Sequence, residues 1–106
     1  MSVALVYITA GNAEEARRIG RVLVESRLAA CANILGPTTA IYRWEGAIQE
    51  DNEAVLIVKT RMALVPTLSE KVAALHGYDC PCVVALPIRD GNAAFLKWVE
   101  AETAAQ

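Results

Sequence analysis

The stretch VALVYIT, residues 3–9, decides how this chain folds. It is rich in β-branched and aromatic residues, which predicts a strand. Because successive side chains of a strand point to opposite faces, the stretch has two apolar faces, Val3, Leu5 and Tyr7 against Ala4, Val6 and Ile8. The stretch VLIVKT, residues 55–60, shows the same pattern. A sheet built on these two strands needs apolar cover on both sides.

Two helices are predicted from capping residues and helical spacing. Asn12 is a helix N-cap with Glu15 three residues later, as in a capping box, and this first helix ends near Ser26. The second helix accepts Pro66 only in its first turn, and Gly77 is expected to end it. Its apolar face is formed by Leu64, Leu68, Val72 and Leu75.

A long hairpin is predicted between the two helices. One extended segment runs from about residue 29 to 44 and is interrupted by Gly36–Pro37. After Glu45–Gly46 the chain returns as a second extended segment that ends at Thr60. The stretch EDNE, residues 50–53, is interpreted as either a bulge or a solvent-exposed tip.

The element order predicts an α+β fold. A strand at residues 82–88 and a last helix, carrying Phe95, Leu96, Trp98 and Val99, complete the order βαββαβ plus a C-terminal helix. We expect a single domain of residues 1–106 with a ferredoxin-like antiparallel sheet of strand order 4-1-3-2. Proline fits only edge strands or bulges, and Pro37 and Pro87 fall in the two strands that this order places at the edges.

This fold predicts self-association. Two helices cover one face of such a sheet, and leaving the other face wet forgoes roughly 25 cal/mol of burial free energy per Å². The hydrophobic fraction is 55% in only 106 residues, which also indicates apolar surface buried against another subunit. A partner sheet is therefore the expected cover.

Composition excludes several classes of protein. The net charge is −2, and Lys and Arg form no cluster, so neither nucleic acid nor an anionic membrane is expected as a partner. No apolar run reaches the ~20 residues of a membrane span, and the N-terminus lacks the pattern of a signal peptide. A cytoplasmic location is expected, and three cysteines make a structural disulfide framework improbable there.

The stretch LHGYDCPCVVALPI, residues 75–88, carries the candidate metal ligands His76, Cys80 and Cys82. In an extended strand both thiols would project to one side, and two thiolates with an imidazole suit Cu(I) or Zn(II). Cys31 would be a fourth ligand only if the fold or a neighbouring subunit brings it close. Two other interpretations remain open. The cysteines are either a strained redox pair or small buried side chains, and His76 then caps the last carbonyls of its helix.

Two further residues have two interpretations each, and a third has one. Trp44 is either an anchor between subunits or a local clasp on Tyr42, whereas Trp98 is expected to pack its helix against the sheet. Lys59 is either a strand-end lysine whose stem lies on apolar surface or the basic wall of a cleft.

Several stretches resemble the CutA, or divalent-cation tolerance, family. They are RLAACANI (27–34), IYRWEGAI (41–48), VLIVKT (55–60), LHGYDCPCVVALPI (75–88) and FLKWV (95–99), and they span nearly the whole chain in the family's order. The resemblance implies a compact homotrimer with inward-facing sheets, and a link to tolerance of copper and other divalent cations. It also places Lys59 near an intersubunit crevice that His76 and Tyr78 approach. This chain has Gly77 and Cys82 where the family pattern has proline and glutamate, so a softer metal site is expected.

The function predicted from the sequence is a cytoplasmic trimeric metal-tolerance protein. It would bind copper or zinc weakly and reversibly, without an obligatory cofactor. The alternative is a small-molecule sensor or signalling scaffold like the trimeric PII regulators, which is an analogy of fold alone. An enzyme is not expected, because the chain has one histidine, no G-x-S-x-G motif and no spaced acidic pair.

Overall fold

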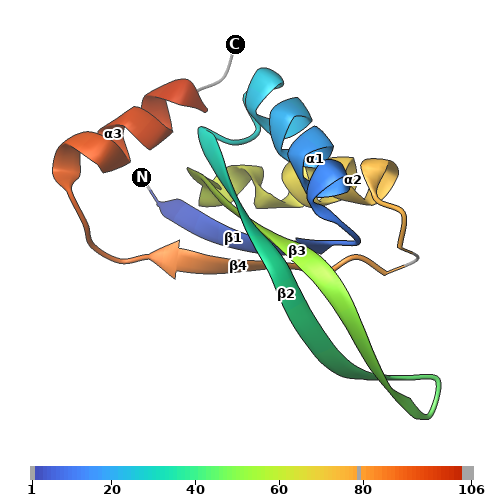
Figure 1. Ribbon diagram of the computed structural model, residues 1–106. Helices are drawn as coiled ribbons and strands as arrows, with labels where there is room; N and C mark the ends of the chain where they lie inside the picture. Colours follow the sequence, from blue (N-terminus) through green and yellow to red (C-terminus); the bar gives the residue numbers. More distant parts are fainter. Residues whose placement is uncertain (1, 79, 104–106) are drawn as a thin grey trace.

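The computed structural model describes residues 2–78 and 80–103. Four strands and three α-helices follow one another as predicted (Figure 1). Their bounds are β1 Val3–Ala10, α1 Ala13–Glu25, β2 Cys31–Trp44, β3 Ala47–Arg61, α2 Val65–Leu75, β4 Val83–Ile88 and α3 Ala93–Glu102, with a 3-10 turn at Met62–Leu64 before α2. Among the described residues, no helix combines the length and the apolar character needed to cross a membrane.

The sheet has the strand order β2-β3-β1-β4, and every pair is antiparallel. This is the predicted order, 4-1-3-2 read from the other edge. Val6 of the central strand β1 lies opposite Val58 on one side and Ala85 on the other. Pro37 and Pro87 lie in the edge strands β2 and β4, where a missing N–H costs least.

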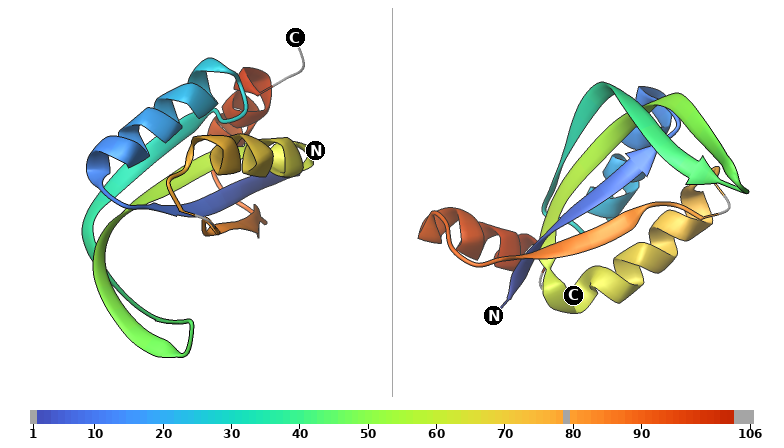
Figure 2. Two further views of the ribbon diagram at one scale, coloured as in Figure 1. Left: turned by 90° about the vertical axis from the view of Figure 1, so that its right-hand side faces the viewer. Right: turned by 90° about the horizontal axis from the view of Figure 1, so that it is seen from below.

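Helices α1 and α2 lie side by side on one face of the sheet (Figures 1 and 2). Asn12 caps α1 by accepting the N–H of Glu15, at 2.8 Å, as the capping-box pattern predicted. The side chains of the core between helices and sheet are fully buried, among them Val6, Ile8, Ile19, Leu23, Leu56, Val58, Leu68 and Val72. Thr60 is also buried there, and its hydroxyl donates to the carbonyl of Leu28 at 2.7 Å.

The other face of the sheet lies away from α1 and α2 and is called the open face; α3 covers only its end at Val3. Its central members are Leu5, Tyr7, Ile57 and Lys59, with Cys31, Asn33, Leu35, Val84 and Leu86 on the edge strands. Val84 is 51% exposed and Leu86 is 54% exposed. The prediction that the two helices cover only one of two apolar faces is therefore confirmed. The homotrimer that would cover the other face stays a prediction.

Strands β2 and β3 continue past the sheet as a long hairpin that curves away from the helices (Figure 2). Its turn is Glu45–Gly46, where φ is 49° and 81°, the positive values that a two-residue hairpin turn requires. The pairing register shifts between Leu35 and Thr38, at Gly36–Pro37. The interpretation of residues 50–53 as a bulge or a tip is wrong, because Glu50 pairs regularly with Ile41. The irregularity lies instead at the proline, which has no N–H for the ladder.

Helix α3 packs near the N-terminal end of β1. Val99 is fully buried, and it clusters with Val3 and Ala30. The prediction that Trp98 packs against the sheet is wrong, since the residue is 41% exposed and its ring contacts that of Phe95 in a tilted arrangement with centroids 5.6 Å apart. Val99 and Leu96, rather than the aromatic residues, face the sheet.

Candidate functional site

The loop between α2 and β4 carries most of the predicted site residues. Helix α2 ends at Leu75, and His76 is already extended, with φ −83° and ψ 147°. The helix thus ends just before Gly77, as predicted, but Gly77 is not in the left-handed conformation of a glycine cap, because among the described glycines only Gly46 has a positive φ. The N–H of Gly77 instead donates to Glu15 Oε2 at 3.0 Å, and an added Cβ would lie only 3.0 Å from that oxygen. A larger residue at position 77 would therefore require the Glu15 carboxylate to shift by a few tenths of an ångström.

Glu15 holds this loop to the start of helix α1. Its carboxylate accepts the N–H of Gly11 at 2.9 Å with one oxygen and the N–H of Gly77 at 3.0 Å with the other. Burial raises the pKa of Glu15, but these hydrogen bonds outweigh it, so that the pKa lies below its ordinary value of 4.5. The ionised carboxylate therefore fixes the position of the cysteine-bearing loop.

His76 uses both ring nitrogens within the chain. Its Nδ1 accepts the N–H of Tyr78 at 3.0 Å, and its Nε2 lies 2.5 Å from the carbonyl oxygen of Thr9. These partners assign the proton of the neutral ring to Nε2, which then donates to Thr9. The interpretation of His76 as a cap on its own helix is wrong, because the ring reaches across to β1. To ligate a metal, His76 would have to give up one of these two hydrogen bonds.

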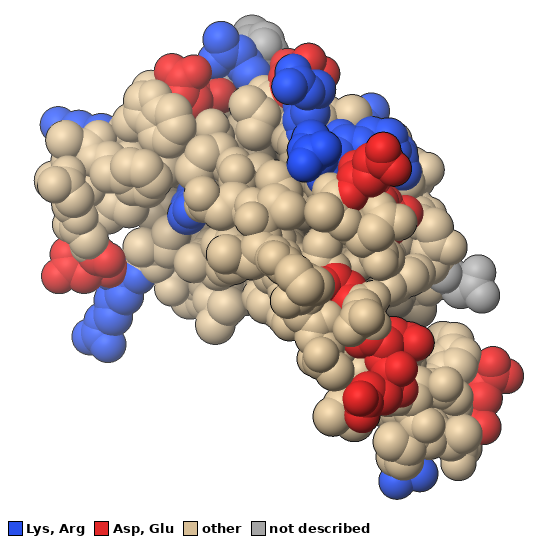
Figure 3. All heavy atoms as spheres, viewed as in Figure 1, with Lys and Arg blue, Asp and Glu red and all other residues tan. Residues whose placement is uncertain are grey.

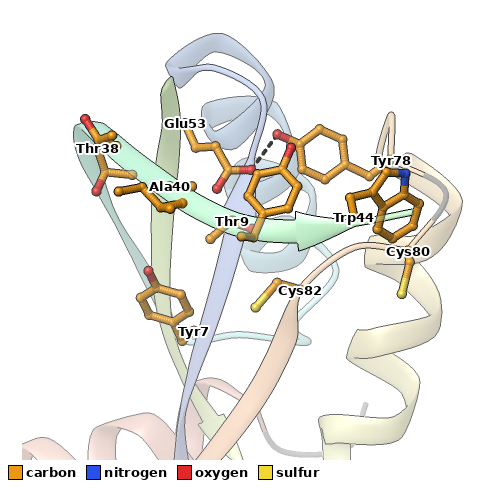
Figure 4. Close-up of a pocket in the computed structure, with 12 residues that line it drawn as sticks. Tyr7, Thr9, Thr38, Ala40, Trp44, Glu53, Tyr78, Cys80 and Cys82 are labelled. Atoms are coloured by element: carbon orange, nitrogen blue, oxygen red, sulfur yellow. Dashed lines mark hydrogen bonds between the residues drawn. The ribbon is translucent and has the colours of Figure 1, made fainter. Parts of the chain in front are cut away.

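A cleft of about 480 Å³ lies where the hairpin meets the open face (Figure 4). The end of β1, both strands of the hairpin and the α2–β4 loop form its walls. The lining residues are Tyr7, Thr9, Thr38, Thr39, Ala40, Ile41, Tyr42, Trp44, Glu53, Tyr78, Cys80 and Cys82. Five of the predicted site residues thus come together here: Tyr42, Trp44, Tyr78, Cys80 and Cys82.

Two tyrosine–carboxylate pairs order the hairpin side of the cleft. Tyr78 donates its hydroxyl to Glu53 Oε2 at 2.6 Å, and Tyr42 donates to Asp51 Oδ2 at 2.5 Å. Burial and then the hydrogen bond to Glu53 raise the pKa of Tyr78, and the hydrogen bond to Asp51 raises the pKa of Tyr42. Both hydroxyls therefore stay protonated at neutral pH, and both rings are held in place.

The two cysteines of the loop border the same cleft. Cys80 is exposed and Cys82 is half-buried, and both are free thiols. The prediction that a strand holds both thiols is wrong, because β4 begins only at Val83. Both cysteines still line the same cleft, although their sulfur atoms do not point toward one another (Figure 4). Within residues 2–78 and 80–103, no three His, Cys, Asp or Glu side chains are grouped as a metal would need.

Cys31 lies far from this pair within one chain. It lies on the open face and pairs with Lys59 of β3, which in turn pairs with Leu5 of β1. The backbone carbonyl of Cys82 accepts the N–H of Thr9, which lies four residues beyond Leu5 along β1. Three strand spacings and four residues along the strand separate the two cysteines by roughly 20 Å. Cys31 would join Cys80 and Cys82 only across two copies of the chain.

Trp44 lines the cleft, whereas Lys59 lies outside it. Lys59 is half-buried on the open face, and its Nζ donates to Asn33 Oδ1, so it is not among the residues that line the cleft. Trp44 lines the cleft and is 48% exposed, and the ring contacts found among the described residues do not include a clasp on Tyr42. Its role as an anchor between subunits stays a prediction.

Two residues of the site were not predicted as such. Glu15 was interpreted only as part of a helix cap, and Glu53 only as part of the stretch at residues 50–53. Glu53 is the last acidic residue before the apolar run VLIVKT, so its alternation with Asp51 on one side of the hairpin was the available signal. No local pattern pointed to the contact between Glu15 and Gly77, which are 62 residues apart.

Sequence and structure comparisons agree on the relatives of this chain. The family described as CutA1 divalent ion tolerance protein matches residues 4–102. The divalent-cation tolerance protein CutA of Thermus thermophilus is 50% identical over 99 residues, 93% of this chain and 96% of that protein. Protein CutA of Mus musculus is 43% identical over 102 residues, 96% of this chain, which spans 58% of the mouse protein's length.

The fold agrees equally well with solved structures. The crystal structure of CutA1 from Oryza sativa matches with a TM-score of 0.96 at 40% identity, and the match covers 100% of this chain and 97% of that chain. The resemblance drawn from the sequence motifs is thereby confirmed. This chain belongs to the CutA1 divalent ion tolerance protein family.

Proposed function

We propose that this protein is a cytoplasmic, homotrimeric divalent-cation tolerance protein that binds copper or zinc weakly and reversibly. The observation that carries the proposal is the family match over residues 4–102, since relatives that share the whole fold are named for this function. The proposal is one of binding, without catalysis.

The thiols of Cys80 and Cys82 are the proposed ligands. They are the soft donors of the cleft, and Cys80 is open to solvent. Two thiolates suit Cu(I), whereas a structural zinc site needs four ligands. Because the two sulfur atoms point apart and His76 is engaged by Thr9 and Tyr78, binding would require the loop to rearrange. This cost agrees with weak binding and with a preference for Cu(I) over Zn(II).

The proposed homotrimer would cover the open face. Leu86 and Val84 lie exposed at its edge, and Ile41 and Ile48 lie exposed on the hairpin. Such an amount of apolar surface marks an interaction site in a protein that is otherwise well packed. Assembly would also bring a second chain's side chains to the cleft between the hairpin and the sheet.

Metal titration tests the ligand assignment. Cu(I) and Zn(II) would be titrated into the wild type and into the variants Cys80→Ser, Cys82→Ser and His76→Ala, with a competing chelator to report affinity. We expect each serine variant to lose most of its Cu(I) affinity. Cys31→Ser is the matched control if the site lies within one chain. Equal Cu(I) affinity in all of these variants would reject the proposed site.

The cleft itself favours a second candidate function, a trimeric small-molecule sensor or signalling scaffold of the PII kind. Its volume of about 480 Å³ is within the range of small-molecule sites, and its lining mixes aromatic rings with a few polar groups. A ligand that binds only the native state raises the unfolding midpoint, so a thermal-shift screen of metabolites would distinguish this function from metal binding.

A further inference from the structure

The lining of the cleft has an uncommon combination of side chains. Four aromatic residues, from three separate parts of the chain, line it: Tyr7, Tyr42, Trp44 and Tyr78. Glu53 adds a carboxylate among them, and none of the described lining residues is a lysine, an arginine or a histidine. The described lining is therefore aromatic and acidic, without a basic side chain of this chain to compensate the charge.

The carboxylate of Glu53 is held in place and remains available to a ligand. Its Oε2 accepts the hydroxyl of Tyr78 at 2.6 Å, and among the described residues no donor contacts its Oε1. Asp51 lies two residues away on the same side of β3, so it adds negative charge beside the cleft. Figure 3 shows acidic side chains along the hairpin, whereas Lys and Arg gather mainly over the helices.

We propose that this cleft binds a small organic cation, an alkylammonium group that sits against the aromatic rings and the Glu53 carboxylate. The negative faces of Tyr and Trp rings attract cations, and quaternary ammonium groups are recognised by such sets of rings. The carboxylate supplies the opposite charge, and about 480 Å³ accommodates a ligand of choline size. Thr9, Thr38 and Thr39 line the same cleft and offer hydroxyl groups to a polar tail.

Other ligand classes fit the lining less well. A phosphate or carboxylate would meet Glu53 without any basic partner among the described lining residues. A neutral apolar ligand would leave the carboxylate unpaired as it became buried, which costs free energy. The same ammonium chemistry has two sources, a free amine or the lysine of a second copy of this chain, and the experiment separates them.

This inference is independent of the proposed metal binding. It rests on the second candidate function, the small-molecule sensor, and names alkylammonium ions as the class of ligand. The probe is choline, and its neutral isostere 3,3-dimethylbutan-1-ol is the matched ligand control. Trp98→Phe leaves Trp44 as the one tryptophan, so its fluorescence reports the cleft. We expect saturable quenching by choline and an affinity for the isostere that is about tenfold lower.

Two variants with the same change of charge test the role of Glu53. Glu53→Gln removes the cleft carboxylate but keeps an acceptor for Tyr78, and we expect it to weaken choline binding about tenfold. Glu50→Gln is the control, because Glu50 lies on the opposite side of the same strand and is not among the lining residues. Its choline affinity should equal that of the wild type. Equal binding of choline and the isostere, or equal affinities of the two variants, would overturn the proposal.

Two further measurements separate this proposal from its alternatives. Choline should still bind Cys80→Ser and Cys82→Ser, so failure of the metal site would leave the inference untouched. If a lysine from a second copy fills the cleft instead, choline would bind only after dilution dissociates the oligomer, as sedimentation at several concentrations would show. Absence of choline binding to dissociated, folded protein would reject the ammonium site.

Discussion

The two faces of the sheet come from the same strands, but they are in opposite environments. On the helix face, Val6 and Leu56 are fully buried beneath α1 and α2. On the open face, Leu86 is 54% exposed although it lies beside the same central strand. Because both faces are apolar, the polarity of their residues does not explain the difference in exposure. The difference arises because α1 and α2 lie on one face only. One face is covered within the chain, and the other would be covered by the proposed homotrimer.

The largest effect is expected on the helix face. Leu56→Ala should lower the free energy of unfolding by about 3 kcal/mol, because it removes buried methyl groups and leaves a cavity. Urea unfolding followed by circular dichroism measures this change. Leu56→Met is the control, since a change that conserves volume should cost below about 1.5 kcal/mol. A loss under about 1 kcal/mol for the alanine variant would mean that this face is not the core of the chain.

The same substitution on the open face sharpens the comparison. If the proposed homotrimer covers Leu86, then Leu86→Ala should cost about 2 kcal/mol per chain and shift assembly to a higher protein concentration. Sedimentation and urea unfolding at several concentrations measure both quantities. A cost below about 0.5 kcal/mol with no concentration dependence would show that Leu86 stays in solvent.

A smaller effect is expected where the helix layer meets the cysteine loop. Glu15→Gln should lower the free energy of unfolding by about 1 kcal/mol at neutral pH, because it weakens the hydrogen bonds to Gly11 and Gly77. The folded-state pKa of Glu15 is lowered, so this stabilisation is present above 4.5 and is lost as the pH falls through the folded-state value. Urea unfolding of both proteins between about pH 3 and pH 7 should show the difference shrinking toward acid. A difference that does not depend on pH would contradict the ionic role of Glu15.

The smallest effect is expected on the solvent side of α1. Arg21 and Glu25 form an ion pair at 3.9 Å, with side chains that are 73% and 65% exposed. Arg21→Ala should therefore change the free energy of unfolding by less than about 0.5 kcal/mol. The same urea assay provides the measurement, and a loss near that of Leu56→Ala would show that the helix makes another contact on that side.

The strand order was predictable because it depends on local chemistry. The missing N–H groups of Pro37 and Pro87 exclude these residues from central strands, and the apolar pattern of residues 3–9 and 55–60 marks the central ones. The start of α1 was equally predictable, since Asn12 contacts a residue only three positions away. Both of these features depend on near neighbours in sequence, and both were predicted correctly.

The site was predicted less well, because its contacts join distant parts of the chain. The ring of His76 reaches Thr9, and the N–H of Gly77 donates to the carboxylate of Glu15. The directions of the two thiols depended on whether residues 80–82 belong to a strand, and β4 begins just after them. Side-chain direction follows the backbone, so an error of a single residue in a strand boundary changes which groups meet.

The two-residue turn of the hairpin has a consequence for how its length can change. With Trp44 and Ala47 paired directly beside the turn, inserting one residue into a single strand would reverse the sides to which the following side chains point. Adding one residue to each strand would keep the pairing but move Tyr42 and Trp44 to the convex side. Only additions of two residues per strand would preserve the aromatic wall while extending the arm by roughly 7 Å. Viable length variants of this arm are therefore expected to come in even steps.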